Sequence, residues 1–373
     1  MYKIVNYFFQ IIFLILNQDS KKYIFTSSPD FSDNSFAFFI YLDQNHKFTP
    51  VWLLNNADQI KEFQDIADNH GTRNDIVFIR KNSLLGIYHY LTANFVFSTH
   101  GIFRKFGRIK GHKTINLWHG MPIKNIENYD KNNKSDPDSS NIYIVTSKFY
   151  KEYFYKIFNV EQSSVLVTGL PRNDFLINGA ADIVKALKIK LKVTKVIMWM
   201  PTFRESNNKL NPIFSIENIS LLNLFLEKSN SFCTIKLHPQ DNTDLTFIDT
   251  FDRIKVIDDK IFKKNYLYEF FNSVDILLTD FSSIYIDFLL LNKPIGFFTP
   301  DIKSYSDERG FLFKNIEDIM PGEILKDMNE VVHFLENIIV KNKDVNIVKR
   351  EKVKDLFHDI ENNFSKKLES KIL

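Results

Sequence analysis

The sequence contains little cysteine and little excess of charge. Cys233 is the only cysteine among 373 residues, so no disulfide can form within the chain. It lies in the apolar run 232–235, where we expect a buried strand residue, because a reactive thiol needs an accessible, electropositive setting. The formal net charge of +3 is far below the basic excess of a dedicated nucleic-acid-binding protein. We therefore expect neither a disulfide scaffold nor binding to nucleic acid.

The sequence also lacks an internal repeat, a low-complexity tract and a cysteine–histidine cluster with metal-ligand spacing, so no metal site is expected. An apolar stretch over residues 4–16 is shorter than the roughly 20 residues that span a bilayer as a helix. No small-residue cleavage site follows it, which argues against a signal peptide. Two interpretations remain open: an interfacial membrane segment over residues 1–20, or a buried first helix.

What the sequence does contain is a regular alternation of short apolar strands and helix-compatible stretches. This pattern predicts an α/β fold with parallel sheets covered by helices on both faces. The chain is also too long for one compact core. The strands that we expect are 22–26, 49–54, 75–79, 95–99, 114–118, 142–146, 196–200, 233–237, 254–257, 276–279 and 294–298.

The strands fall into two series. We expect one domain over residues 21–185, a second over 190–345, and a closing C-terminal helix over 346–373. If two such domains face each other, the carboxyl ends of both sets of strands meet at one cleft, where open α/β sheets bind ligands. The informative residues are therefore those that follow strands.

In the first domain His119 follows a predicted strand. It precedes Gly120, which lets a ligand approach the backbone closely. Near neutral pH this histidine could accept a proton from an attacking hydroxyl, and Lys124 could neutralise phosphate. The alternative is a histidine that packs on Trp118 without a chemical role.

In the second domain His238 follows a strand and precedes Pro239. This histidine could donate to a phosphate oxygen, or it could be satisfied by local hydrogen bonds. The hydroxyl-rich segment 279–283 lies at a strand-to-helix junction, where free N–H groups favour an anion. An ordinary helix cap by Asp280 or Ser282 accounts for the same pattern and does not exclude anion binding.

Two further cationic features allow two interpretations each. Arg204, just past a strand, could hold a phosphate through two hydrogen bonds or could form a surface ion pair. His100 also follows a strand and precedes the basic stretch 104–113, and such a stretch is usually a solvated face. Its functional alternative is contact with an anionic polymer or a lipid pyrophosphate.

Taken together and in order, these motifs resemble the CDP-glycerol glycerophosphotransferase family, the polymerases and primases of teichoic acid and of related capsules. Each piece alone is weak, but the ordered set is specific, and it covers roughly residues 22–340. The matching pieces are Trp118-His119-Gly120 with Pro122 and Lys124, Pro201-Thr202-Phe203-Arg204, Lys236-Leu237-His238-Pro239, Thr279-Asp280-Phe281-Ser282-Ser283 with Asp287, Lys293-Pro294, Arg309-Gly310-Phe311 with Pro321-Gly322, and the early segment 29–34.

The resemblance implies a GT-B architecture, in which two Rossmann-like domains face each other across a cleft, and a displacement that needs no metal ion or other cofactor. An acceptor hydroxyl would attack the β-phosphorus of CDP-glycerol or CDP-ribitol and release CMP. His119 and His238 would be catalytic, with His119 as the base. The residues implied for binding the donor phosphates are Arg204, Thr279, Asp280, Ser282 and Ser283, and those implied for binding substrate are Gly120, Lys124, Thr202, Pro239 and Asp287.

The resemblance also implies a place and a partner. The acceptor would be a lipid-linked or polymeric glycan, and the protein would work as a peripheral protein at the cytoplasmic face of the bacterial plasma membrane. The mild positive charge would favour an anionic membrane surface.

Two positions depart from the family pattern, since Met121 stands where we expect threonine and Phe203 where we expect tryptophan. Met121 could alter the choice of donor or acceptor. Two other functions also stay open: a GT-B glycosyltransferase that uses a nucleotide sugar, and a non-catalytic scaffold of a polymer export complex. Histidines after strands in both domains argue against the scaffold.

Overall fold

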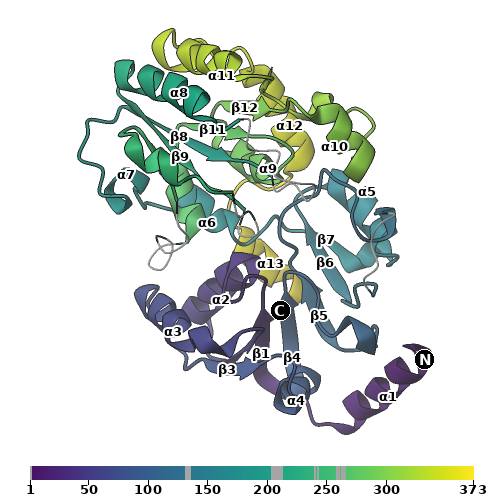
Figure 1. Cartoon of the computed structure of the whole chain (residues 1–373). Coiled ribbons are helices and arrows are strands. Elements are labelled where there is room, and N and C mark those ends of the chain that lie inside the picture. Colours follow the sequence, from purple (N-terminus) through teal and green to yellow (C-terminus); the bar gives the residue numbers. More distant parts are fainter. Residues whose placement is uncertain are drawn as a thin grey trace. The chain divides into compact units, whose positions relative to one another are not determined.

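The computed structural model describes residues 2–130, 136–202, 213–238, 241, 243–257, 261 and 266–373. The chain divides into two compact units (Figure 1). Unit 1 comprises Met1–Met121, Ile126–Phe175 and Leu356–Leu373, and unit 2 comprises Pro122–Asn125 and Leu176–Asp355. The chain thus passes into unit 2 for four residues directly after Met121, and it returns to unit 1 near its C-terminus. Each unit contains one parallel sheet, which confirms the predicted α/β class.

Unit 1 is built on a seven-stranded parallel sheet with the order β3-β2-β1-β4-β5-β6-β7. Its central strands are almost continuous runs of buried apolar residues, as expected where helices cover both faces. The register places Ser98 beside Asn116, so β4 and β5 end at the same level. The strands are β1 Asp19–Thr26, β2 Thr49–Leu54, β3 Val77–Arg80, β4 Ala93–Ser98, β5 Lys113–Asn116, β6 Ile142–Val145 and β7 Val165–Val167.

The helices of unit 1 begin with serine caps at several points. Ser83 accepts from the amide of Gly86, and Ser147 accepts from that of Tyr150. Aromatic rings pack against each other in the core. For example, the ring centroids of Phe31 and Trp52 lie 4.6 Å apart. The helices are α1 Tyr2–Ile15, α2 Asp33–Asn45, α3 Ile60–Asn69, α4 Leu84–Thr92, α5 Lys148–Ile157, α6 Asn173–Asn178, which runs into unit 2, and α13 Phe364–Ile372. Short 3₁₀ turns lie at Ala57–Gln59, Arg104–Phe106, Glu127–Tyr129 and Gln162–Ser164.

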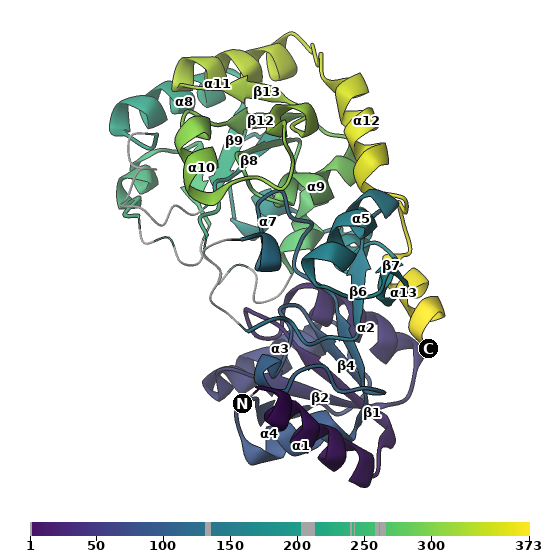
Figure 2. The ribbon, with the colours of Figure 1, turned by 90° about the vertical axis from the view of Figure 1, so that its right-hand side faces the viewer.

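The segment 346–373, expected as one closing helix, contains the two helices α12 and α13, and its residues 356–373 belong to unit 1. Helix α13 contacts α2, as both views show (Figures 1 and 2). The Tyr41 hydroxyl donates to Glu369 at 2.5 Å, and Asp174 accepts from the amides of Phe364 and Ser365 at 2.9 and 2.8 Å. These bonds tie the last turns of the chain to helices formed much earlier in the sequence.

Unit 2 is built on a six-stranded parallel sheet with the order β10-β9-β8-β11-β12-β13. Helices α8 and α11 pack against each other and share one apolar core with the strands. The strands are β8 Lys195–Met200, β9 Ser231–Ile235, β10 Ile254–Val256, β11 Ile276–Thr279, β12 Ile295–Phe298 and β13 Glu323–Leu325. The helices are α7 Ile183–Ala186, α8 Ile216–Lys228, α9 Ile284–Phe288, α10 Ile302–Arg309, α11 Met328–Leu335 with a π turn at Glu336–Val340, and α12 Ile347–Phe357. The 3₁₀ turns lie at Thr246–Thr250, Leu267–Ser273, Leu289–Leu291 and Ile316–Ile319.

Helix α1 is a surface helix with one packed side and one exposed side. One side, with Phe9, Ile12 and Phe13, packs on the core of unit 1. The other side exposes apolar residues, among them Leu14 and Ile15. Within the described ranges, none of the helices has the length and apolar character to cross a membrane.

Candidate functional site

The strand ends of unit 1 bring two histidines together. His100 follows β4 and His119 follows β5, and their rings stack with centroids 3.9 Å apart and planes 4° from parallel. The ring of Trp118 also contacts His119, at 4.3 Å. The packing on Trp118 that the sequence offered as the role-free alternative therefore exists, but it accompanies a second histidine that faces the same ring.

The hydrogen bonding of His119 fixes its tautomer. Its Nδ1 lies 3.0 Å from the carbonyl oxygen of Thr99. A carbonyl oxygen only accepts, so Nδ1 carries the hydrogen and Nε2 keeps a lone pair. Burial lowers the pKa of His119, and Arg172 and Arg104 act in the same direction, whereas the bond to Thr99 and the charge of Asp33 act against it. A neutral imidazole with a free Nε2 lone pair is the state that a general base requires.

The backbone that carries His119 is held by buried side chains. Trp118 adopts a left-handed conformation with φ 55°, and its amide donates to the side chain of Asn116 at 2.8 Å. The fully buried Asn34 donates through Nδ2 to the carbonyls of Leu117 and Trp118, at 3.2 and 2.9 Å. Such strained, over-determined turns are typical of functional sites.

Arg172 completes this support. Its Nη1 donates to the carbonyl of His119 at 2.9 Å and to Asp33 at 2.8 Å. The next residue in the turn, Gly120, has φ 128°, a conformation that L side chains rarely adopt. Three successive carbonyls of the turn are therefore bonded, which leaves the imidazole as the group that can act on a ligand.

Sequence reasoning missed most of this support. Asn34 lies in the segment 29–34 that the family resemblance includes, but no role was predicted for it. Arg172 follows β7, a three-residue strand that the sequence pattern did not predict. Thr99 and Asn116 contribute through a carbonyl and a short side-chain bond, for which no sequence signal exists.

Lys124 belongs to unit 2 and not to the unit of His119. It forms an antiparallel bridge with Phe311, and its Nζ lies 5.8 Å from the centroid of the Tyr305 ring. The amide of Leu312 donates to the carbonyl of Ile123 at 2.9 Å. The segment after His119 is thus anchored on the Arg309-Gly310-Phe311 motif, two pieces of the resemblance that lie far apart in the sequence.

In unit 2 the adjacent strands β9, β8 and β11 end in the remaining motifs. Asp280 accepts from the amide of Thr202 at 2.9 and 3.1 Å and from its hydroxyl at 2.5 Å. The hydroxyl of Thr279 donates to the carbonyl of Met200 at 2.7 Å. These bonds join the ends of β8 and β11, so the geometry of Thr279 and Asp280 favours holding the strand ends over direct contact with phosphate.

The other residues of unit 2 differ in exposure. Asp287 is fully buried and accepts from the hydroxyl of Tyr268 at 2.7 Å, which again favours a supporting role. Ser282 and Ser283 are partly exposed at the start of α9, and His238 is exposed after β9. These three side chains can reach a ligand. The predicted sites Arg204 and Pro239, and the family departure Phe203, lie outside the described residues.

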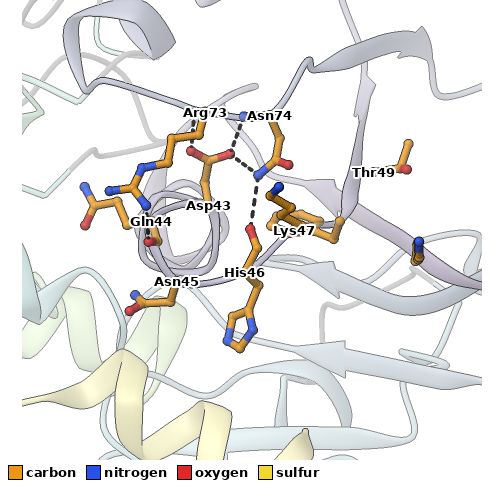
Figure 3. A pocket seen from close by; sticks show the side chains of 10 residues that line it. Asp43, Gln44, Asn45, His46, Lys47, Thr49, Arg73 and Asn74 are labelled. Carbon is orange, nitrogen blue, oxygen red and sulfur yellow. Dashed lines mark hydrogen bonds between the residues drawn. The ribbon is translucent and has the colours of Figure 1, made fainter.

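A pocket of about 440 Å³ lies elsewhere, at the amino ends of β1 and β2 (Figure 3). Asp43 at the end of α2 accepts there from the amides of Arg73 and Asn74, at 2.6 and 3.0 Å, and from the Asn74 side chain. Its lining includes none of the predicted site residues. Because the carboxylate is used to tie α2 to the loop between α3 and β3, the arrangement is that of a structural hollow, and ligands of parallel sheets bind at the opposite strand ends.

Comparison with known proteins extends this picture. The family model for CDP-Glycerol:Poly(glycerophosphate) glycerophosphotransferase matches residues 7–370. The teichoic acid poly(glycerol phosphate) polymerase of Bacillus spizizenii is 26% identical over 380 residues, which cover 92% of this chain and 90% of that protein. The teichoic acid glycerol-phosphate primase of Bacillus subtilis is 29% identical over 243 residues, which cover 61% of this chain and 60% of the primase.

A further relative is named as a ribitol-phosphate polymerase. The teichoic acid poly(ribitol-phosphate) polymerase of Bacillus spizizenii is 26% identical, over 67% of this chain and 42% of that protein. The chain thus spans nearly the whole of one relative and about half of others.

Solved structures show the same fold. The wall teichoic acid polymerase TagF matches with a TM-score of 0.75 at 23% identity, over 98% of this chain and 93% of that chain. A UDP-GlcNAc 2-epimerase from Neisseria meningitidis matches with a TM-score of 0.56 at 12% identity, over 94% and 98%. At these identities the similarity concerns the fold alone, and it confirms the predicted GT-B-like class.

Proposed function

Since the chain belongs to the CDP-glycerol:poly(glycerophosphate) glycerophosphotransferase family, whose model matches residues 7–370, we propose that it transfers glycerol phosphate or ribitol phosphate from a CDP-activated donor to an acceptor hydroxyl. The acceptor is a teichoic acid or capsule polymer, or its lipid-linked precursor. Support for the donor comes from the family and from a TagF structure described as soaked with CDPG. The family that the ordered motifs predict is confirmed.

The observation that carries the chemistry is the tautomer of His119. With Nδ1–H donated to the carbonyl of Thr99, Nε2 is ready to accept the proton of the acceptor hydroxyl. The oxygen of that hydroxyl forms a new bond to the β-phosphorus, the bond from this phosphorus to the CMP oxygen breaks, and CMP leaves with the electron pair. The products are a phosphodiester and CMP, and the base returns its proton to solvent.

The donor phosphates need fixed hydrogen-bond donors, because positioning and electrostatic stabilisation dominate phosphoryl transfer. We assign this role to His238, Ser282 and Ser283, together with Arg204. Thr202, Thr279 and Asp280 hold together the ends of β8 and β11, and Asp287 joins α9 to the 267–273 turn. Gly120, Lys124 and Pro239 are the further residues that we propose to bind substrate.

The test is nucleotide release by the purified protein. CDP-glycerol, CDP-ribitol and several nucleotide sugars are each incubated with a lipid-linked acceptor extract. We expect CMP from one CDP-polyol, and a rate that is about 10² to 10⁴ times lower in His119→Gln, because the general base is lost. The matched control is His333→Gln, an exposed histidine on α11, which should leave the rate unchanged.

Other outcomes would move the assignment. A nucleoside diphosphate released from a nucleotide sugar would indicate a glycosyltransferase. If calorimetry shows that a donor binds but no nucleotide is released from it, the result would indicate a non-catalytic scaffold of a polymer export complex.

We also propose that the protein works at the cytoplasmic face of the plasma membrane as a peripheral protein. The exposed side of α1 supports this proposal, because an apolar helix face without a partner is typical of interfacial helices. It presents Ile4, Tyr7, Phe8, Ile11, Leu14 and Ile15. Helix α4 contacts α1 and exposes Leu84, Leu85 and Tyr88.

Exposed cations lie beside this helix. The side chain of Asn6 donates to the carbonyls of Phe106 and Arg108, and Gln10 exchanges two hydrogen bonds with the backbone of Lys110. The bonds fix α1 along the basic stretch, in which Lys105, Arg108 and Lys110 are exposed. Cations next to an apolar face favour an anionic lipid surface.

Vesicle sedimentation tests this part of the proposal. We expect binding to vesicles with anionic lipid, and loss of binding in the double variant Phe8→Ser, Ile11→Ser. Lys105→Gln with Lys110→Gln should weaken binding roughly ten-fold or more, since each cation contributes about 1 kcal/mol at such a surface. Val345→Ser with Val348→Ser, two exposed valines of unit 2, is the control. Equal binding by all four proteins would refute the assignment of α1.

A further inference from the structure

His100 lies flat on the ring of His119, and the reaction proposed above gives it no role. The two residues follow adjacent parallel strands, whose register places Ser98 beside Asn116. The ring centroids are 3.9 Å apart and the planes differ by 4°. Two imidazoles at this distance repel each other when both are protonated, so the pair favours states with at most one charge.

We propose that His100 is a positioning residue of the transfer reaction, whose neutral ring covers one face of His119 and keeps that imidazole uncharged, oriented and ready to accept the proton. This inference rests on the proposed function, in which His119 is the base. His100 itself does not exchange a proton with the substrate.

Thr99 links the two rings. Its carbonyl accepts the Nδ1–H of His119 at 3.0 Å, and its hydroxyl lies 2.8 Å from Nδ1 of His100. The same hydroxyl accepts from the amide of Ser28 at 3.3 Å, and because a hydroxyl can both donate and accept, it can bond to His100 in either tautomer of that ring. His100 is held at its backbone too, since Arg104 donates to its carbonyl at 2.9 Å. Neither ring can turn without breaking a hydrogen bond.

The surroundings keep His100 neutral. Burial lowers its pKa to about 2, and the charges of His119, Arg104 and Lys81 act in the same direction. No acidic side chain opposes them among the causes that act on this ring. His100 is therefore uncharged throughout the pH range in which an enzyme works, and it can serve as a cover but not as an acid or base.

The balance at His119 is different. Burial lowers its pKa, Arg172 and Arg104 add to this effect, and Asp33 and the hydrogen bond to Thr99 oppose it. The ring of His100 excludes water from one face, so it contributes to the burial that dominates the balance. If that face were opened to water, the pKa of His119 should rise toward the ordinary value of 6.5.

Two substitutions separate the ring contact from the hydrogen bond. His100→Asn can still form a hydrogen bond with the Thr99 hydroxyl but cannot cover the imidazole, whereas His100→Phe covers it but cannot form this bond. The pKa of His119 is measured by NMR titration of histidine-labelled protein, with His119→Gln to identify the signal and His333→Gln as the control. We expect His100→Asn to raise this pKa by about half to one pH unit and His100→Phe to leave it within error of the wild type.

The pH dependence of activity should change in the same variant as the pKa of His119. The acid limb of the pH–rate profile for CMP release should move upward by the same amount in His100→Asn and stay in place in His100→Phe. Thermal unfolding of each variant checks that it is folded, and either variant alone still tests the ring contact.

The opposite result has a clear meaning. If His100→Phe raised the pKa and His100→Asn did not, or if neither did, the ring contact would have no such role and the inference would be wrong. If the NMR pKa moved in His100→Asn but the rate profile did not, the ring contact would stand, and the proposed function of His119 as the base would be the part that failed.

Discussion

The two units hold their functional side chains in different ways. In unit 1, buried groups bond the backbone around His119 and leave one imidazole nitrogen for chemistry. In unit 2, Thr279, Asp280 and Asp287 are themselves bonded to the chain, and only neighbouring side chains project. The firm support in unit 1 fits the proposed role of His119 as a base, because a catalytic group must be held within about 0.5 Å of its productive position. Residues of one family motif can therefore differ in role. In the motif 279–283, Asp280 is bonded to the chain, whereas Ser282 is partly exposed.

The largest effect should come from removing the support of His119. Asn34→Leu keeps the size of this buried side chain but leaves the carbonyls of Leu117 and Trp118 and the amide of Arg172 unpaired. We expect CMP release to fall about 10²-fold, the cost of a misplaced catalytic group, and the free energy of unfolding to fall by about 2–4 kcal/mol.

The neighbouring residue provides the control. Ser35 is equally buried on α2, and its hydroxyl donates to the carbonyl of Thr26, away from the His119 turn. Ser35→Ala should lower stability by about 1 kcal/mol without a change in rate. Similar losses of activity in both variants would show that Asn34 acts through general stability.

The second effect concerns the stability of the two units at low pH. His112 is buried in unit 1 and its pKa is lowered to about 4, chiefly by burial. Between the ordinary value of 6.5 and this value the unfolded chain binds more protons than the folded one. Stability is therefore complete above pH 6.5 and falls as the pH is lowered, by about 3 kcal/mol from His112 alone. His100 and His119 act in the same direction, so we expect unit 1 to unfold first on acidification.

The three tryptophans allow a direct measurement of this difference. Trp52 and Trp118 lie in unit 1 and Trp199 in unit 2. Fluorescence of Trp199→Phe then follows unit 1, and that of the double variant Trp52→Phe, Trp118→Phe follows unit 2. His112→Phe, which keeps the aromatic contact with Tyr90, should reduce the acid sensitivity of unit 1. Coincident acid transitions of both reporters would contradict the expected order.

A smaller effect should follow from loosening unit 2. In Asp280→Asn the negative charge is lost, and the oxygen that accepts from the Thr202 amide at 3.1 Å is replaced by an NH₂ group that cannot accept, so the end of β8 is less firmly held. We expect the KM for the donor to rise about ten-fold with little change in kcat, because binding geometry and not proton transfer is affected.

The control lies at the other end of the same two strands. Asp275 accepts from Lys195 and from the amide of Val196, both at 2.9 Å, at the amino ends of β8 and β11. Asp275→Asn should lower stability but leave the KM unchanged. An unchanged KM in Asp280→Asn would mean that the link to Thr202 does not shape the donor site.

The sequence predicts the fold well where local signals are strong. Every expected strand overlaps an observed one, because buried parallel strands are nearly continuous apolar runs. Of the three-residue strands, β10 lies within an expected run, whereas β7 and β13 were not predicted, because a run of three residues gives only a weak pattern. The association of residues 356–373 with unit 1 depends on long-range bonds such as Tyr41 to Glu369, which no local pattern reveals.

The site could be predicted only as far as motifs reach. His119 and His238 follow strands and belong to short motifs, so the sequence marks both as candidates. The stacking of His100 on His119 depends on the lateral order of β4 and β5, and the support by Arg172 depends on a residue more than fifty positions away. The sequence shows which residues follow strands, but it does not show which strands are neighbours.

The smallest effect should come from Met121, the position that departs from the family pattern. Its side chain is completely buried in unit 1, directly before the chain enters unit 2, so its role is packing. Met121→Thr would leave a cavity and bury a hydroxyl, and should lower the free energy of unfolding by about 1–3 kcal/mol. The ratio of CMP released from CDP-glycerol and from CDP-ribitol should not change. A changed ratio would show that a residue next to the His119 turn selects the donor, and the simple division between a catalytic unit 1 and a donor-binding unit 2 would have to be abandoned.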